Sequence, residues 1–189
     1  MSLNKKIVIG VGILCVLIGI VIIIRSEEMT SPTIVSRVPI TDTQGFDAQN
    51  ATYTIDGKEF KIVDGISRIA TAPGSATEVI TRYFGNEATG DINSDSIDDK
   101  AFLITQETGG SGVFYYVVAA IKNGDGYKLT PAYFIGDRIA PQTTEIRSGE
   151  LMVNYADRKA GEPMTTQPSV GKTLYLKVNS DGALEKVTK

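Results

Sequence analysis

The sequence of 189 residues contains no histidine, and this absence narrows the chemistry open to the protein. Without imidazole there is no Ser-His-Asp triad, no Cys-His nucleophile pair, no histidine general base and no imidazole ligand for zinc. An enzyme built from this chain would have to work with carboxylates, tyrosine or lysine.

Cysteine and positive charge are also scarce. Cys15 is the only cysteine, and Leu14 precedes it where a lipoprotein cleavage site would need a small residue. A single thiol allows no disulfide within the chain, so the fold must be stabilised by its core and by any bound metal. The net charge of −3 and the pI near 5.1 indicate no basic face, which argues against a nucleic-acid partner.

One long hydrophobic run is present near the N-terminus. Ile7 to Ile24 contains neither charge nor proline, and at about 1.5 Å per residue it is long enough to cross a bilayer core. Lys5 and Lys6 precede the run and Glu27 and Glu28 follow it, which favours an N-terminus inside and a C-terminal part outside. The sequence predicts one transmembrane helix anchoring a single-pass protein in the cytoplasmic membrane. A cleaved signal peptide is the alternative, but the A-x-A pattern of a cleavage site is missing.

The chain divides into three parts by composition. Residues 1–25 form the predicted cytoplasmic tip and transmembrane anchor. Residues 26–49 are rich in Ser, Thr, Pro, Asp and Gln with little periodicity, which is typical of a flexible stalk. Residues 50–189 have the size of one domain and are predicted to form an extracytoplasmic β-rich domain.

Short apolar blocks separated by glycine-containing turns predict antiparallel hairpins in this domain. The turns are expected at Asp56-Gly57, Gly109–Gly112, Asn123–Gly126, Ser148-Gly149 and Asp181-Gly182. Val113–Ile121 is expected to be a central strand buried on both faces, and Pro131 marks an edge or a bulge. Residues 75–84 favour a strand, although Ser75-Ala76-Thr77-Glu78 also resembles a helix capping box and leaves a short helix as the alternative.

The sharpest motif is the run from Asp91 to Asp99, which places oxygen-bearing residues at alternate positions. Calcium takes six to eight oxygen ligands, and loops that wrap it supply side chains from positions 1, 3, 5 and 9 and a carbonyl from position 7. These positions hold Asp91, Asn93, Asp95, Asp99 and, for the carbonyl, Ile97. The sequence therefore predicts a structural calcium ion in a loop between two strands.

Two positions depart from the usual calcium loop. Ser96 stands where glycine normally makes the sharp turn, and Phe102 stands where an EF-hand places a bidentate glutamate. The second departure excludes a standard EF-hand, and the small number of carboxylates points to weak affinity, roughly 10⁻⁴ to 10⁻³ M. The alternative reading is a solvated acidic turn, with Asp98 as surface charge.

The segment Gly90–Leu103 resembles the calcium-binding hairpins of FG-GAP repeats, the integrin α propeller type. That resemblance implies that the residues matching Asp91, Asn93, Asp95, Ile97 and Asp99 hold the ion. The segment is not repeated, so a propeller is not expected. Thr81–Gly85, Gly136–Glu145 and Asn154–Arg158 extend a likeness to small uncharacterised membrane-anchored bacterial proteins, which implies a cell-envelope location and no particular activity.

A second group of polar residues could bind a ligand: Asp137, Arg138, Tyr155, Asp157 and Arg158. If the two segments are adjacent, the two guanidinium groups could grip a carboxylate or phosphate. The alternative is that each Asp-Arg pair only stabilises its own loop.

Two functions follow from these patterns. The first is a non-enzymatic, membrane-anchored calcium-binding module of the cell envelope that contacts an envelope protein or glycan. The alternative is a hydrolase acting on an envelope polymer with carboxylates such as Asp137, Glu145 and Asp157, because glycosidases need only two carboxylates.

Overall fold

The computed structural model describes residues 45–189, and in this range the chain is built from β-strands without any helix. This confirms the prediction of a mainly antiparallel β domain. Within the same range, no helix has the length and apolar character needed to cross a bilayer. The anchor expected at Ile7–Ile24 lies outside the described residues.

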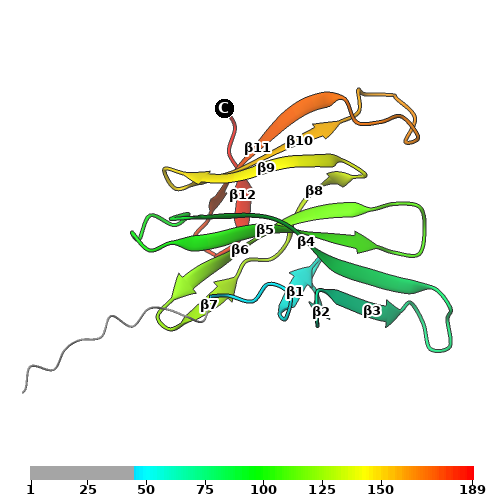
Figure 1. Ribbon diagram of the computed structural model, residues 1–189, viewed down its shortest axis with the longest axis horizontal. Helices are drawn as coiled ribbons and strands as arrows, with labels where there is room; N and C mark the ends of the chain where they lie inside the picture. Colours follow the sequence, from blue (N-terminus) through cyan, green and yellow to red (C-terminus); the bar gives the residue numbers. More distant parts are fainter. Residues whose placement is uncertain (1–44) are drawn as a thin grey trace, which may run out of the picture. The chain divides into compact units, whose positions relative to one another are not determined.

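Residues 45–189 contain twelve strands, shown in Figure 1. They are β1 (Thr52–Ile55), β2 (Lys58–Lys61), β3 (Ile66–Ala70), β4 (Glu78–Gly90), β5 (Asp99–Glu107), β6 (Phe114–Asn123), β7 (Gly126–Leu129), β8 (Tyr133–Asp137), β9 (Ala140–Arg147), β10 (Glu150–Asp157), β11 (Val170–Val178) and β12 (Leu184–Lys186).

The predicted hairpin turns are confirmed. Asp56 and Gly57 have φ angles of 49° and 75°, and Ser148 and Gly149 have 52° and 72°. Two consecutive residues with positive φ make the tight turn whose twist matches antiparallel strands. Glycine adopts this conformation without strain, which explains why β1–β2 and β9–β10 turn at these pairs.

Residues 78–84 belong to the long strand β4, so the strand prediction is confirmed and the alternative of a short helix is wrong. Two neighbours hold this strand: Val79 pairs with Ile69 of β3, and Ile80 pairs with Glu107 of β5. Ser75 does not cap a helix. Its hydroxyl oxygen accepts a hydrogen bond from the Thr77 backbone N–H at 3.0 Å within the β3–β4 turn. The capping-box residues therefore shape a turn between strands.

The strands form three sheets, all antiparallel. The central sheet has the order β3-β4-β5-β6-β7, with β8 also pairing with β6; a four-stranded sheet has the order β12-β11-β10-β9; and β1 pairs with β2 alone. Pro131, expected at an edge or a bulge, lies between β7 and β8, and β7 is at the edge of the central sheet. In Figure 1 the four-stranded sheet lies above the central sheet and the β1–β2 hairpin below it.

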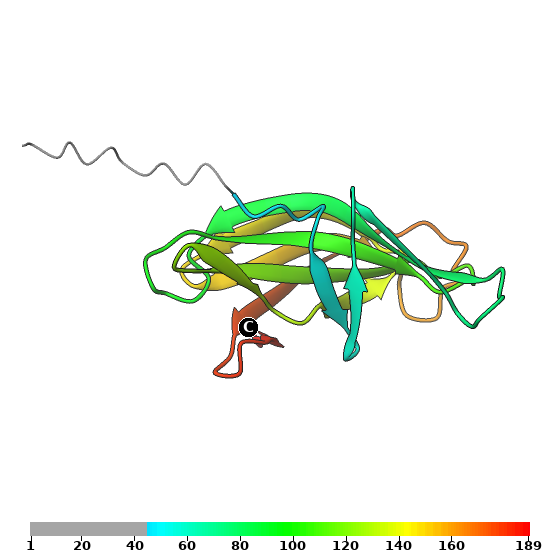
Figure 2. The ribbon, with the colours of Figure 1, turned by 90° about the horizontal axis from the view of Figure 1, so that it is seen from below.

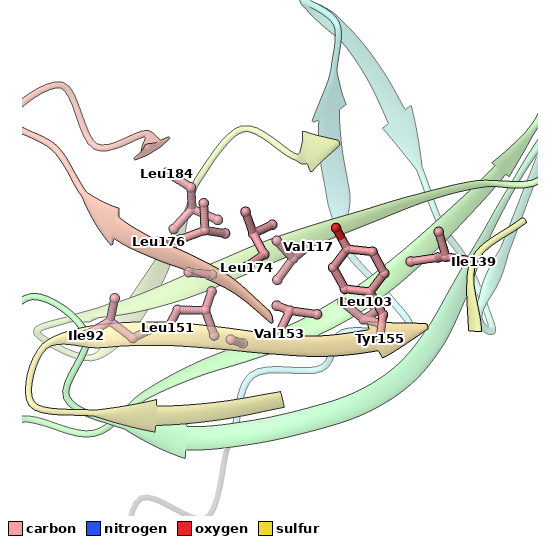
Figure 3. Packing of buried hydrophobic residues seen from close by; sticks show 12 residues of the cluster. Ile92, Leu103, Val117, Ile139, Leu151, Val153, Tyr155, Leu174, Leu176 and Leu184 are labelled. Atoms are coloured by element: carbon pink, nitrogen blue, oxygen red, sulfur yellow. The ribbon is translucent and has the colours of Figure 1, made fainter. Parts of the chain in front are cut away.

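Strands β5 and β6 are buried on both faces, because alternate side chains of a strand point to opposite sides. Leu103 and Val117 pack toward the four-stranded sheet, together with Leu151, Val153 and Leu176 (Figure 3). On the other face, Phe102, Ile104 and Val118 pack against Tyr53, Ile55 and Phe60 of the hairpin. Figure 2 shows this hairpin crossing the strands of the central sheet steeply. The prediction that Val113–Ile121 is a central, doubly buried strand is thus confirmed for the body of β6.

The packed domain begins before residue 50, inside the segment expected to be stalk. The ring of Phe46 stacks on Phe102 with centroids 5.7 Å apart, and Ala48 is buried. The carbonyl of Ala48 accepts a hydrogen bond from the buried Tyr53 hydroxyl at 2.5 Å. A fragment of the domain would therefore have to include residues from about 45 onward.

Phe102 lies in the core between the central sheet and the β1–β2 hairpin. It is fully buried and contacts the rings of Phe46, Tyr53 and Tyr83, so its substitution tests this core. Phe102→Ala is expected to lower the free energy of unfolding by about 3–5 kcal/mol, measured by urea titration with circular dichroism. Phe84→Ala is the matched control, because this ring is 45% exposed and should cost less than about 1.5 kcal/mol. Equal losses in the two variants would contradict the doubly buried arrangement.

Candidate functional site

The predicted metal loop lies between β4 and β5, which pair up to its base at Gly90 and Asp99. The strand–loop–strand arrangement expected from the sequence is therefore present. Ile92 is only 2% exposed and belongs to the core between the sheets, near Leu151 in Figure 3. The loop is thus attached to the core by its second residue as well as by its two ends.

The carboxylate of Asp91 organises the turn. Its Oδ1 accepts the backbone N–H of Ser94 at 2.6 Å and of Asp95 at 3.1 Å, and its Oδ2 accepts the N–H of Ser96 at 2.8 Å. Ser94 and Ser96 have φ angles of 65° and 68°. Serine at the sixth position therefore adopts the left-handed conformation for which glycine is usually selected, at some conformational cost.

Asn93 and Asp95 stand on the exposed side of the loop. Asn93 Oδ1 accepts the N–H of Asp95 at 3.1 Å, and Asp95 Oδ1 accepts the N–H of Ile97 at 2.8 Å. Asn93 Nδ2 donates to Asp95 Oδ2 at 2.9 Å. The side chain of Ile97 is 47% exposed, so at this position only the backbone carbonyl is suited to a polar role.

Asp99 differs from the others because it is fully buried. Its Oδ2 accepts the N–H of Ile92 at 3.0 Å, and its Oδ1 accepts the N–H of Lys122 in β6 at 2.8 Å. Burial raises the pKa of this carboxyl, the two backbone N–H groups act in the opposite direction, and the negative charges of Asp95 and Asp91 raise the pKa further. Asp99 therefore connects the loop to the central sheet through hydrogen bonds, and its pKa responds to the charges of Asp91 and Asp95.

The donor chemistry of the loop suits calcium, since the predicted ligands offer only oxygen atoms. The arrangement of side chains is less complete: among residues 45–189, no three Asp, Glu, Cys or His side chains are grouped closely enough to hold a metal ion. The carboxylates are turned toward backbone N–H groups of their own loop. Each carboxylate oxygen can accept a further interaction, so these hydrogen bonds do not use up the ligand capacity.

The β9–β10 turn lies directly against the loop, a neighbour that the sequence did not reveal. A Cβ atom at Gly149 would lie 2.7 Å from Ser94 Oγ, and one at Gly90 would lie 3.0 Å from the Ile146 side chain. A cavity of about 350 Å³ follows this junction, lined in part by Asn93, Ser94 and Gly149. Ser148-Gly149 carried only a hairpin signal, and nothing local indicates that the turn packs on a loop more than fifty residues earlier.

The second predicted group comes from two segments, 137–138 and 155–158, and the fold places these segments next to each other. Arg158 Nη1 donates to the carbonyl of Arg138 at 3.0 Å, and its Nε donates to the carbonyl of Thr166 at 2.5 Å. Arg138 pairs with the neighbouring Asp137, with Nη2 and Oδ2 2.9 Å apart. Arg138 thus pairs within its own loop, as the alternative interpretation expected, whereas Arg158 does not pair with Asp157 and instead donates to a carbonyl of the other segment and to Thr166.

Tyr155 and Asp157 also make contacts that stabilise the fold. Tyr155 is 9% exposed and packs in the core between the sheets, where burial raises the pKa of its hydroxyl. Asp157 Oδ2 lies 2.7 Å from Lys172 Nζ, and Asp157 Oδ1 accepts the N–H of Arg158 at 2.7 Å. The lysine partner comes from β11 and was not among the predicted residues, because only the β10–β11 pairing places it there.

Two of the three carboxylates proposed for a hydrolase, Glu145 and Asp157, lie apart in the four-stranded sheet, and Asp137 ends β8, which pairs with the central sheet. Glu145 pairs with Met152 and forms an ion pair with Arg147, whereas Asp157 ends β10. Five strand positions separate Met152 from Asp157, or roughly 16 Å. Catalytic carboxylate pairs in glycosidases are about 5–9.5 Å apart, so these two residues do not form such a pair.

Asp99→Asn should destabilise the domain even without calcium, because an amide can accept only on its oxygen and leaves one backbone N–H without an acceptor. The expected loss is about 1–3 kcal/mol in the free energy of unfolding, measured in EDTA. Asp98→Asn, one residue earlier and exposed, is the control and should lie within about 0.5 kcal/mol of the original protein. An unchanged or raised stability of Asp99→Asn would contradict the anchoring role.

We expect the ion pair of Asp157 with Lys172 to make a pH-dependent contribution to the free energy of unfolding. The hydrogen bond from Lys172 lowers the pKa of its carboxyl, so the contribution is present above the unfolded-state value near about 3.9 and is lost as the pH falls through the folded-state pKa. Because both side chains are partly exposed, Asp157→Asn should cost only roughly 0.2–1 kcal/mol at pH 6. The difference from the original protein should shrink below about pH 4 in urea titrations. Asp181→Asn changes an exposed carboxylate in the β11–β12 turn and should leave the free energy of unfolding at pH 6 within about 0.5 kcal/mol of the original.

Comparison with known proteins adds no family to this description. No family model, no curated protein and no solved structure matches the chain.

Proposed function

We propose that the protein is a single-pass protein of the cytoplasmic membrane whose extracytoplasmic β domain binds calcium and acts as a binding or structural module of the cell envelope. The apolar run Ile7–Ile24, with its flanking charges, supports the anchor and the orientation. The loop Asp91–Asp99 supports the ion site. The proposed ligands are Asp91, Asn93, Asp95, the carbonyl of Ile97, and Asp99.

The observation that carries the calcium proposal is the placement of Asp99. This buried carboxylate closes the loop that begins at Asp91; burial is the main cause that raises its pKa, and the negative charges of Asp95 and Asp91 raise it further. A divalent cation would remove this repulsion, and the surrounding donors are the oxygens that calcium prefers. In this proposal the carboxylates of Asp91, Asp95 and Asp99, which now accept backbone N–H bonds, regroup around the ion.

Calcium in this position would serve stability instead of catalysis. Asp99 accepts hydrogen bonds from Ile92, whose side chain lies in the core, and from Lys122 in β6. An ion held by the loop would therefore reinforce both the β4–β5 connection and the edge where β6 turns into β7. The carboxylates considered for hydrolysis are either paired with basic side chains or too far apart, and this supports a non-enzymatic role.

Calorimetric titration of calcium into the full-length chain in detergent, combined with thermal melts, tests this function. We expect one saturable site with a dissociation constant of roughly 10⁻⁴ to 10⁻³ M. At tenfold excess over that constant, binding should add about 1.4 kcal/mol, seen as a rise of a few degrees in Tm. Asp95→Ala should abolish both the heat and the rise.

Asp98→Ala is the matched control, because it removes a carboxylate from the same loop at a position that is not a predicted ligand. It should leave the titration within about twofold of the original, in line with a small screened charge effect. Absence of heat and of any Tm shift up to about 10 mM calcium would contradict the proposal. Equal losses in the two variants would show nonspecific attraction to an acidic turn.

A further inference from the structure

A second cavity lies at the opposite end of β5 from the calcium-type loop. Its volume is about 480 Å³, and its lining residues are Asp56, Gln106, Thr108, Phe114, Tyr116 and Phe134. Seven strand positions separate Gln106 from Asp99, or roughly 24 Å. The cavity has the size of a small-molecule site and is separate from the proposed ion site.

Aromatic rings form the walls of this cavity. The centroid of Phe134 in β8 lies 5.5 Å from that of Tyr116 and 6.3 Å from that of Phe114, both in β6. Phe134 is 49% exposed, whereas Tyr116 is almost buried. Three rings on two paired strands therefore present their surfaces to one space, and the outermost ring remains accessible to a ligand.

The polar lining can accept hydrogen bonds but carries no positive charge. Asp56 supplies the only charged group among the lining residues, and none of the ion pairs found in residues 45–189 involves it. Burial raises the pKa of the Tyr116 hydroxyl, and the negative charge of Asp56 raises it further. The Asp56 carboxylate therefore contributes negative potential at the Tyr116 side of the cavity. Gln106 donates its amide nitrogen to Thr81 Oγ1 at 3.2 Å, which leaves the amide oxygen as an acceptor.

We propose that this cavity binds a quaternary ammonium compound, with the cation against Phe114, Tyr116 and Phe134 and Asp56 as its counter-charge. A cation is attracted to the negative faces of aromatic rings, and a carboxylate at the rim adds to that attraction. An anionic ligand would be repelled by the Asp56 carboxylate. A primary ammonium has three N–H groups that need acceptors, whereas a quaternary ammonium needs none and presents methyl groups to the rings.

The hairpin β1–β2 makes the site dependent on the tertiary fold. Asp56 lies in the turn of this hairpin with φ of 49°, a conformation that asparagine also adopts readily. Packing of Tyr53, Ile55 and Phe60 against β5 and β6 brings the turn to the aromatic strands. Asp56→Asn therefore removes the charge while keeping the turn.

The test is calorimetric titration of choline into the full-length chain, with 3,3-dimethylbutanol as the neutral analogue of nearly the same shape. We expect saturable binding of choline below about 10 mM and at least tenfold weaker binding of the alcohol. Asp56→Asn and Phe134→Ala should each weaken choline binding by about tenfold or more. Calcium should not change the affinity, since the two sites lie at opposite ends of β5.

Two matched controls make the outcome specific. Asp64→Asn changes the aspartate of another Asp-Gly turn, with φ of 50°, that does not line the cavity, and Phe84→Ala removes a ring of similar exposure elsewhere. Both should bind choline within about twofold of the original protein. Equal binding of choline and the alcohol, equal effects of Asp56→Asn and Asp64→Asn, or no saturation would each overturn the proposal.

Vesicles of phosphatidylcholine, compared with phosphatidylglycerol, identify the source of the cation. If the protein binds free choline, prefers phosphatidylcholine vesicles, and loses that preference in Asp56→Asn, the site is assigned to a lipid headgroup. Binding of free choline without a preference between vesicles would assign it to a soluble quaternary ammonium compound. A vesicle preference that persists in Asp56→Asn while choline fails to bind would overturn the site.

Discussion

The fold depends on the burial of both faces of the β5–β6 pair. Alternate residues of these strands enter two separate cores, with Leu103 and Val117 on one side and Phe102 and Val118 on the other. A strand pair that is apolar on both faces cannot remain stable in water unless two further layers cover it. The four-stranded sheet and the β1–β2 hairpin are these layers. The chain reaches back to Phe46 to complete the second one, since this ring stacks on Phe102.

Both candidate sites are consequences of this three-layer arrangement. The loop Asp91–Asp99 connects β4 to β5, and its buried carboxylate accepts a hydrogen bond from the backbone of β6, so the loop is attached to both strands of the doubly buried pair. The aromatic cavity forms at the other end, where the hairpin turn at Asp56 meets β6 and β8. The proposed ion ligands all come from one contiguous loop, whereas the lining of the aromatic cavity comes from several segments that are far apart in the chain. Their geometry is maintained by strands that are themselves held by core packing, which limits how far a ligand-free site can distort.

The Asp137–Arg158 group does not offer two available guanidinium groups, because both are already bonded within the protein. Arg158 reaches the carbonyls of Arg138 and Thr166, and Arg138 pairs with its neighbour Asp137. Long loops carry backbone carbonyls that need donors, and arginine supplies several in a fixed geometry. From the sequence the same residues were compatible with ligand binding, because spacing does not reveal which partner lies across the gap.

Local chemistry determined the secondary structure to a large extent. Asp-Gly and Ser-Gly pairs specify tight turns, and alternating or continuous apolar runs specify strands. The antiparallel hairpins, the central strand β6 and the strand–loop–strand setting of Asp91–Asp99 were therefore predictable from the sequence. Residues 75–84 were ambiguous, and only pairing with β3 and β5 decided for a strand. Burial of Asp99, contact of Gly149 with the loop, the Asp157–Lys172 pair and the cavity around Phe134 depend on contacts between residues far apart in the chain. Such contacts arise from the packing of whole layers, so no local pattern carries them, and only the tertiary structure decided them.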